Sequence, residues 1–336
     1  MKRIKWMDLT RSLAIGSVVL LHVADEYLSR ISLTELQWVL YQCFRILGRL
    51  GVPLFLMLSG ALILPSISKT PIVTFYNKRL PQFIILTIFY FFITNAFCIY
   101  LFDLQFDIKD YLYSLITFKP TFAYQLWYMY IIITLYILSP FMARLLAALS
   151  THSIVIIYIV FCVAIFVPIS MGKLGFHALW NQYVPYIAYF LFGYLIFNRG
   201  IVKEISKPSL LCAFTASWVV TLCTQIYLKE NNDFHGEGVT WYTSPFILFT
   251  SLTLFSLLSK LTTNESTCNL IELVSLNSFG IYLIHLVPMF FMLKVMSGVH
   301  INVMAKIAII SLVVFSFSFA YSYLLSKIPL IKKLVV

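Results

Sequence analysis

The sequence predicts an all-α protein, a polytopic transmembrane helical bundle of about ten spans without a soluble domain. Hydrophobic residues make up 61% of the chain and charged residues 11%, whereas soluble globular proteins average about 25% charged residues. The apolar residues gather in long blocks, many near the roughly 20 residues that a helix needs to cross a bilayer. Blocks such as 84–100 and 154–168 lack the two-residue alternation of barrel strands, which argues against a membrane β-barrel.

Ten apolar segments are expected to cross the membrane, so both termini are expected on one side. The segments on that side hold fourteen Lys and Arg residues and the opposite segments hold six, which predicts cytoplasmic termini by the positive-inside rule. No linker divides the chain, and residues 1–336 are expected to form one membrane domain. The expected spans are 7–28, 40–64, 81–101, 125–143, 153–170, 183–198, 209–228, 242–259, 275–294 and 303–326.

The net charge of +11 reflects an excess of basic residues, most of which fall in the segments expected on the cytoplasmic side. Basic residues gather beside the cytoplasmic ends of membrane helices, where they determine orientation. The expected surroundings are therefore membrane lipids, and no nucleic-acid partner is expected.

The first span carries two ionisable side chains that are costly at membrane depth. Arg11 and His22 are separated by three helical turns plus about 20°, so they share one stripe and lie about 16 Å apart. With a cytoplasmic N-terminus, Arg11 lies near the inner face and His22 towards the outside. Asp8 is within side-chain reach of Arg11, and Asp25 and Glu26 are within reach of His22. A structural ion pair with a hydrogen-bonded core histidine is one explanation; a functional cavity is the other.

Two further pairs of basic residues stand out, one within the second expected span and one just before the third. Arg45 and Arg49 form an i, i+4 pair on one helix face, where they repel unless a carboxylate, carbonyl or anionic ligand faces them. Snorkelling to the interface is the alternative. Lys78 and Arg79 come just before an expected helix start at Pro81, where basic side chains and free helix N–H groups favour phosphates. Membrane orientation alone also explains that pair.

Two later spans carry polar or aromatic groups. Trp127 and Tyr128 open the fourth span, either as part of an aromatic belt at the interface or as the lining of a pocket beside His22. Tyr282 and His285 continue a polar stripe along the ninth span. An intramembrane histidine is often only hydrogen-bonded between helices, but two of them on polar stripes favour a shared cavity.

Taken together and in this order, these motifs resemble acyltransferase family 3, a family of integral membrane O-acyltransferases that includes bacterial enzymes modifying surface polysaccharides. The resemblance covers essentially the whole chain. In one respect the sequence departs from the family: many members carry two arginines three residues apart in the first cytoplasmic loop, where this chain has only Lys78-Arg79. The matching motifs are Asp8-Leu-Thr-Arg11 followed after ten intervening residues by His22, Val52 to Ser59-Gly60, Lys78-Arg79-Leu-Pro81, Leu126-Trp127-Tyr128, and Ser278 to His285.

The resemblance implies transfer of an acetyl group from cytoplasmic acetyl-CoA to a sugar hydroxyl of a polysaccharide such as O-antigen or common antigen, on the periplasmic side of a bacterial inner membrane. Arg11, Lys78, Arg79 and Arg49 are the expected donor-binding residues, since cationic groups suit the phosphates of coenzyme A. Acetyl-CoA is expected as a co-substrate. No metal is expected, because His22 and the other histidines lack metal-ligand spacing.

A mechanism follows as a hypothesis. His22 is expected to act as general base on the acceptor hydroxyl or to take the acyl group itself, with Arg11 as a second essential residue. Asp25 or Glu26 is expected to fix the tautomer of His22. Arg49 or Tyr282 is expected to stabilise the oxyanion. The expected acceptor-binding residues are Trp127, Tyr128, Tyr282, His285 and Ser59, with His285 lining the pocket or relaying a proton.

Three other functions stay open at this point. In the first, the enzyme transfers a succinyl group instead of an acetyl group. In the second, the chain exports a lipid-linked sugar, although no inverted repeat of broken helices is evident. A sensory or structural protein leaves Arg11, His22 and His285 without a purpose. The sugar, its modified hydroxyl and the oligomeric state are not determined by the sequence.

Overall fold

The computed structural model describes residues 4–67, 70–105, 107–117, 121–170, 179–231, 236–261, 268–329 and 331–335. These residues form helices joined by short turns, and no strand occurs among them, in agreement with the all-α prediction. The helices are α1 (Lys5–Leu28), α2 (Glu35–Arg49), α3 (Gly51–Ile67), α4 (Ile72–Phe102), α5 (Ile108–Thr117), η1 (Tyr124–Leu126), α6 (Trp127–Ala148), α7 (Thr151–Ser170), α8 (Leu179–Arg199), α9 (Lys207–Glu230), α10 (Gly236–Val239), α11 (Pro245–Ser259), α12 (Cys268–Ile284), α13 (Leu286–Val295), α14 (Val303–Ser326) and η2 (Lys332–Leu334).

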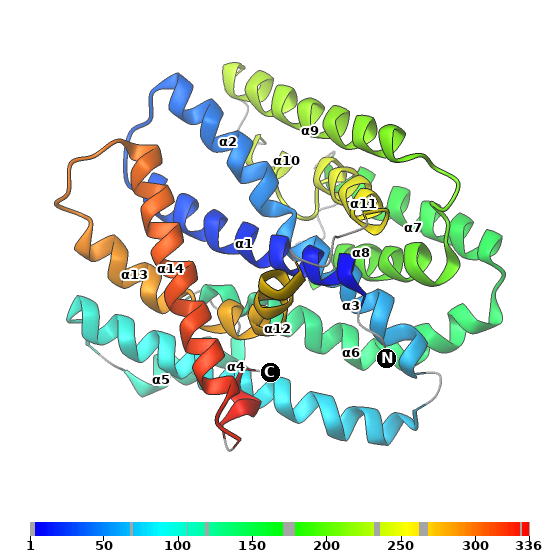
Figure 1. Ribbon diagram of the computed structural model, residues 1–336, viewed down its shortest axis with the longest axis horizontal. Coiled ribbons are helices and arrows are strands. Elements are labelled where there is room, and N and C mark those ends of the chain that lie inside the picture. Colours follow the sequence, from blue (N-terminus) through cyan, green and yellow to red (C-terminus); the bar gives the residue numbers. More distant parts are fainter. Residues whose placement is uncertain are drawn as a thin grey trace.

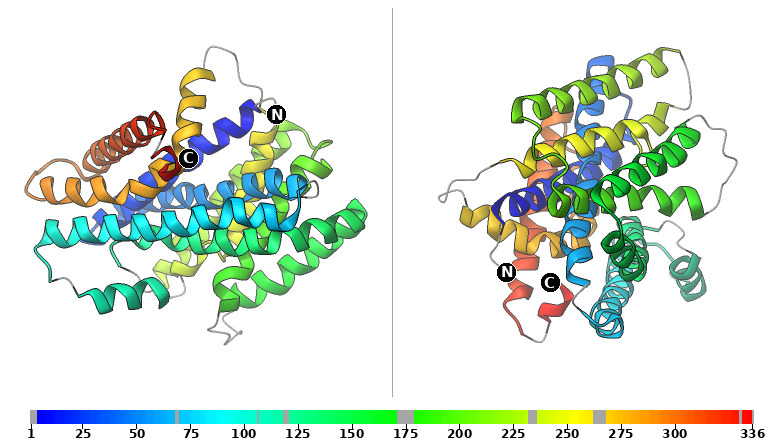
Figure 2. Two further views of the ribbon diagram at one scale, coloured as in Figure 1. Left: turned by 90° about the horizontal axis from the view of Figure 1, so that it is seen from below. Right: turned by 90° about the vertical axis from the view of Figure 1, so that its right-hand side faces the viewer.

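Helix α1 lies at the centre of the bundle, where it packs against α2, α3, α12 and α14. Figure 1 shows α9 along one edge and α4 along the opposite edge, with α1 between them, and the end-on view in Figure 2 shows the same order. The helix with the costly Arg11 and His22 is therefore surrounded by protein on several sides, which lowers the cost of polar groups at membrane depth.

Nine of the ten expected spans fall within a helix or a pair of consecutive helices, and the span 242–259 begins in the turn just before α11. Six stretches of the described chain are long and apolar enough to cross a membrane, and the bent pair α12 and α13 provides a seventh. Helices α7 and α11 offer only shorter apolar stretches. The multi-pass character is thus supported, while the count of ten and the orientation stay predictions.

Glycine allows α3 and α8 to pack backbone against backbone. A Cβ atom on Gly60 would collide with the Phe190 carbonyl, and one on Gly193 would collide with the Met57 carbonyl. Small residues at such crossings are typical of membrane helices, whose association depends on close packing. This contact fixes α3, and therefore the arginine-bearing end of α2 that precedes it.

The structure corrects the start of the third expected span. Helix α4 begins at Ile72 after the N-cap residue Pro71, and Pro81 lies inside it. Proline is tolerated within membrane helices, so Pro81 does not mark a helix start. Lys78 and Arg79 consequently lie beyond the first turn of α4, where the backbone N–H groups are already bonded within the helix. Their two exposed side chains alone remain to attract an anion.

Proline residues do accompany breaks between consecutive helices at two other places. A proline at position i removes a hydrogen bond to the carbonyl at i−4 and clashes with it. Pro53 follows the break between α2 and α3, and Pro288 follows the break between α12 and α13. The second break bends the chain by 65°, so the ninth expected span is a bent helix pair instead of a straight helix. The residue at the bend is His285.

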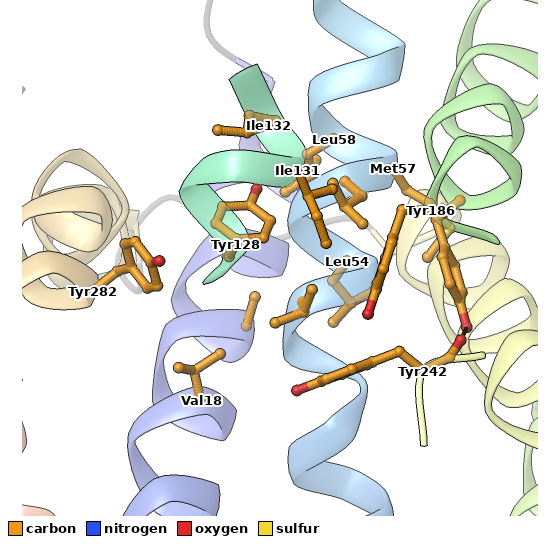
Figure 3. Packing of buried hydrophobic residues seen from close by; sticks show 14 of the residues in the cluster. Val18, Leu54, Met57, Leu58, Tyr128, Ile131, Ile132, Tyr186, Tyr242 and Tyr282 are labelled. Carbon is orange, nitrogen blue, oxygen red and sulfur yellow. Dashed lines mark hydrogen bonds between the residues drawn. The ribbon is translucent and has the colours of Figure 1, made fainter. Parts of the chain in front are cut away.

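One large hydrophobic core runs through the bundle. Figure 3 shows part of it, with Tyr128 of α6 lying between the α3 side chains Leu54 and Leu58 on one side and Tyr282 of α12 on the other. Tyrosines in this core need hydrogen-bond partners for their hydroxyl groups. The hydroxyl groups of Tyr128 and Tyr282 find such partners beside the buried His285.

Candidate active site

The two intramembrane histidines singled out by the sequence meet in the structure. His22 Nδ1 on α1 lies 2.8 Å from His285 Nε2 at the bend between α12 and α13. The rings are stacked with centroids 4.9 Å apart. His285 is completely buried, whereas His22 is partly accessible. His22 is therefore the member of the pair that a substrate can reach.

A backbone carbonyl determines how this pair shares its protons. His285 Nδ1 lies 2.7 Å from the carbonyl oxygen of Tyr282. Because a carbonyl only accepts, His285 Nδ1 carries the hydrogen, and in the neutral ring Nε2 is then an acceptor. His22 Nδ1–H donates to it, which leaves the lone pair of His22 on Nε2. The chain Tyr282–His285–His22 thus presents an unprotonated nitrogen at its accessible end.

Tyr282 is held in place through its other groups. Its hydroxyl donates to the Gln125 carbonyl at 2.6 Å, and the Gln125 amide donates to the Leu283 carbonyl at 3.2 Å. These reciprocal bonds tie η1 to the end of α12. They also fix the carbonyl that orients His285, in the way that outer partners orient a functional histidine.

The other aromatic residues expected at the acceptor site surround this centre. The Tyr128 ring lies edge-on to the Tyr282 ring at 5.4 Å (Figure 3), and its hydroxyl interacts with Ser59. Trp127 packs at 5.3 Å from Tyr242. Trp127, Tyr128, Tyr282 and Ser59 therefore join one connected wall beside the histidines.

Arg45 and Arg49 lie inside the protein, with 9% and 6% of their surface exposed, so interfacial snorkelling does not describe them. Arg49 Nη2 donates to Asp25 Oδ2 at 2.9 Å, and Arg45 Nε lies 3.9 Å from Asp25 Oδ1. The Arg49 guanidinium also stacks 4.6 Å from the Trp241 ring centroid. Two guanidinium groups facing one carboxylate leave one positive charge in excess, within electrostatic range of His22.

The two carboxylates expected to orient His22 are bonded to other residues. Asp25 accepts from Tyr41 at 2.6 Å as well as from Arg49. Glu26 accepts from Arg30 at 2.5 Å and from Tyr124 at 3.4 Å. Arginine and phenol donors compete for these oxygens more strongly than a neutral imidazole does. The hydrogen-bond partner of His22 in the structure is His285, and not Asp25 or Glu26.

Arg11, Lys78 and Arg79 stand apart from the histidine pair. Arg11 pairs with Asp8 at 3.4 Å, and the buried Asp8 accepts from Ser275 at 2.6 Å. Because α1 is continuous from Lys5 to Leu28, Arg11 remains three turns away from His22. Arg79 and Arg11 are both within electrostatic range of Tyr136. The structure thus contains two polar centres on α1, one near each end.

Three tyrosines that contact His22, Asp25 or Arg49 were not predicted from the sequence. Tyr124 places its ring 5.6 Å from His22, Tyr41 binds Asp25, and Tyr242 contacts Arg49 at 5.3 Å from its ring centroid. The chain contains 21 tyrosines, and no spacing distinguishes these three. Only the position of Tyr124 next to the Leu126-Trp127-Tyr128 motif hinted at a role.

The chain was compared with known families, curated proteins and solved structures. A family model described as an acyltransferase domain matches residues 4–326. No curated protein and no solved structure gives a significant match. The matched region contains the histidine pair, the arginine cluster and the Arg11–Asp8 centre. With 336 residues in all, the chain is matched almost from end to end and belongs to acyltransferase family 3, which makes it a membrane acyltransferase.

Proposed function

We propose that this membrane acyltransferase moves an acetyl group from cytoplasmic acetyl-CoA to a sugar hydroxyl of a cell-surface polysaccharide at the outer side of a bacterial inner membrane. The observation that carries the proposal is the hydrogen-bonded chain from the Tyr282 carbonyl through His285 to His22. It leaves a basic nitrogen at the accessible end of a fixed histidine, which is what a hydroxyl acceptor needs.

The reaction uses this nitrogen as a general base. His22 Nε2 removes the proton of the acceptor hydroxyl while the hydroxyl oxygen attacks the thioester carbonyl carbon. The charge that develops on His22 is shared with His285, which accepts from its Nδ1–H. When the tetrahedral intermediate collapses, the carbon–sulfur bond breaks and the proton passes from His22 to the leaving thiolate.

The arginine cluster supports the same reaction. Its excess positive charge lies beside His22, and the Nε atoms of Arg45 and Arg49 are buried without a hydrogen-bond partner among the described residues. Fixed cationic groups that are aimed at a developing negative charge stabilise acyl-transfer transition states. We assign Arg49 to the oxyanion of the tetrahedral intermediate.

The other end of α1 suits the donor. Arg11 is partly exposed and held by Asp8, and Lys78 and Arg79 are exposed on α4. These cations match the phosphates of coenzyme A. Arg11 and His22 are about 16 Å apart along α1, and this is the distance that the pantetheine arm has to cover from the cytoplasmic end to the base. With this arrangement the acyl group crosses while its carrier stays on the inner side.

The experiment compares surface glycans from a gene-deletion strain complemented with the unaltered protein, with His22→Ala or with His152→Ala. His152 is an exposed histidine of α7 and serves as the matched control. Mass spectrometry and NMR should show acyl groups restored by the unaltered and His152→Ala proteins and missing with His22→Ala. The added mass distinguishes acetyl from succinyl. Normal acylation with a stably inserted His22→Ala protein would refute the proposal.

A further inference from the structure

A cleft of about 780 Å³ opens beside the histidine pair. It lies where α1 and α4 end, is bounded by α5, and is closed on one side by Phe290 of α13. Figures 1 and 2 show α5 alongside the C-terminal half of α4. The volume falls within the roughly 300–1,000 Å³ of small-molecule sites. None of the residues expected from the sequence to bind the acceptor lines this cleft.

Aromatic rings form the inner surface of the cleft. Phe102 stacks on Phe122 at 5.8 Å, and Phe122 lies edge-on to Phe290 at 5.6 Å. Tyr124 continues the row at 6.4 Å from Phe290. Such a surface offers flat apolar faces against which the apolar face of a sugar ring can pack.

The cleft is connected to the catalytic centre through one side chain. Tyr124 lines the cleft, and the centroid of its ring lies 5.6 Å from that of the His22 ring. Its hydroxyl is held by Glu26, which also lines the cleft. Tyr124 therefore lies between the cleft and His22 and connects the two.

The polar residues that line the cleft suit a ligand with many hydroxyl groups. Asn95, Gln105 and Ser114 contribute amide and hydroxyl groups. Asp107 and Asp110 contribute carboxylates, which are strong acceptors for hydroxyl hydrogens. Aromatic faces combined with amide and carboxylate acceptors suit a saccharide better than they suit a hydrocarbon chain.

The charge of the lining restricts the class further. Among the described residues that line the cleft, Arg30 is the one cation, and it is paired with Glu26 at 2.5 Å. Asp107 and Asp110 remain as net negative charge. The ammonium of Lys294 donates to the Leu101 carbonyl and keeps its charge, but Lys294 is not one of the residues that line the cleft. An anionic ligand would meet like charge here, which costs binding free energy.

The two aspartates also have a local structural role. Asp107 Oδ1 accepts from the Lys109 N–H at the start of α5, and Asp110 lies in the first turn of that helix. Acidic residues stabilise a helix N-terminus. Asparagine caps a helix about as well as aspartate does, so Asp107→Asn keeps the cap. Asp110→Asn gives up only the small charge–dipole contribution.

The geometry points to this cleft as the binding site for the acceptor, a sugar residue that carries no carboxylate or phosphate. The inference rests on the proposed acyl transfer, since it assigns the acceptor of that reaction, but binding is measured without catalysis. Neutral saccharides bind here and uronic acids or sugar phosphates are rejected.

Photolabelling of the purified full-length protein in lipid nanodiscs tests the inference. The probes are 4-azidophenyl β-D-glucoside and the matching glucuronide, which differ only in one carboxylate. The glucoside should label wall residues such as Tyr111 or Phe122, located by peptide mass spectrometry, and excess phenyl glucoside should suppress the label. The glucuronide should label about tenfold less, because it meets like charge.

Matched variants on α5 make the test specific. Ser114→Trp fills the cleft and should reduce glucoside labelling about tenfold, whereas Ile116→Trp, at a position 72% exposed on the same helix, should leave it unchanged. The double variant Asp107→Asn/Asp110→Asn should raise glucuronide labelling towards the glucoside value. Absence of glucoside label from the cleft, equal labelling in Ser114→Trp, or a ratio unaffected by the double variant would each overturn the inference.

The outcome is separable from that of the proposed function. His22→Ala removes the base but no residue of the cleft, so its photolabelling should equal that of the unaltered protein. Cleft labelling together with intact glycan acylation by His22→Ala would refute the mechanism and retain the cleft. Loss of acylation by His22→Ala without any cleft labelling would retain the mechanism and refute the cleft.

Discussion

His22 and His285 are 263 positions apart in the chain, yet their Nδ1 and Nε2 atoms lie 2.8 Å apart. The contact joins the central helix α1 to the bend between α12 and α13. It makes His285 a positioning residue, since its own Nδ1 is occupied by the Tyr282 carbonyl. The proposed base and the residue bonded to its ring are therefore both histidines.

Replacing His285 tests this assignment. His285→Leu removes the acceptor for His22 Nδ1–H, so the tautomer of His22 is no longer fixed, and kcat should fall about 100-fold or more. The KM for the donor should change little, because the proposed binding residue for the donor phosphates, Arg11, lies three turns away. His285→Gln keeps a hydrogen-bond acceptor and should retain more activity than His285→Leu. Steady-state kinetics of purified protein checks both variants, and an unchanged kcat in His285→Leu would contradict the positioning role.

Asp25 should contribute more to the stability of the protein than the exposed ion pair between Arg30 and Glu26 does. Asp25→Asn leaves Arg45 and Arg49 buried without a countercharge, which should cost about 3 kcal/mol and lower the melting temperature in detergent. Removing one arginine as well, in Asp25→Asn/Arg45→Ala, should recover part of the loss. Arg30→Ala breaks a pair whose arginine side chain is 50% exposed and should cost less than about 1 kcal/mol. Equal melting temperatures for Asp25→Asn and Arg30→Ala would count against the cluster.

The crossing of α3 and α8 should tolerate no added methyl group. Gly60→Ala and Gly193→Ala each place a Cβ against a backbone carbonyl of the other helix, so each should destabilise the protein by about 1–3 kcal/mol. Gly16→Ala is the control, because nothing lies within 4 Å of the added Cβ and alanine favours the helix. Thermal unfolding in detergent measures all three. A melting temperature of Gly60→Ala at or above that of Gly16→Ala would show that the backbones do not approach this closely.

Substitutions of the cationic residues proposed to bind the donor should change the KM for the donor and not kcat. Arg11→Ala removes a cation that is held by Asp8 and should raise the KM for acetyl-CoA about tenfold, as loss of a charge-assisted hydrogen bond does. Lys78→Ala/Arg79→Ala should raise it as well. Arg144→Ala, an exposed cation of α6, should leave it unchanged. If Arg11→Ala instead lowered kcat at saturating donor, Arg11 would belong to the chemical step.

The breaks in the helices illustrate how far local sequence rules reach. Pro53 and Pro288 interrupt their helices, whereas Pro81 lies within the continuous helix α4. The local rule is the same in all three cases, and neighbouring helices decide whether the lost backbone bond is tolerated. For this reason the expected helix start at Pro81 was wrong, and the bend at His285 was not anticipated.

The sequence by itself determined the helical membrane class, the stripe that joins Arg11 to His22, and the motifs that identify the family, because these depend on composition, helical periodicity and residue order. Only the tertiary structure decided which partner each polar group takes. Asp25 and Glu26 lie within about a turn of His22 in the sequence, yet arginines and tyrosines from α2, η1 and the turn after α1 occupy them. His285 reaches His22 because the bend at the end of α12 turns it towards α1, and no rule of local spacing contains that long-range contact.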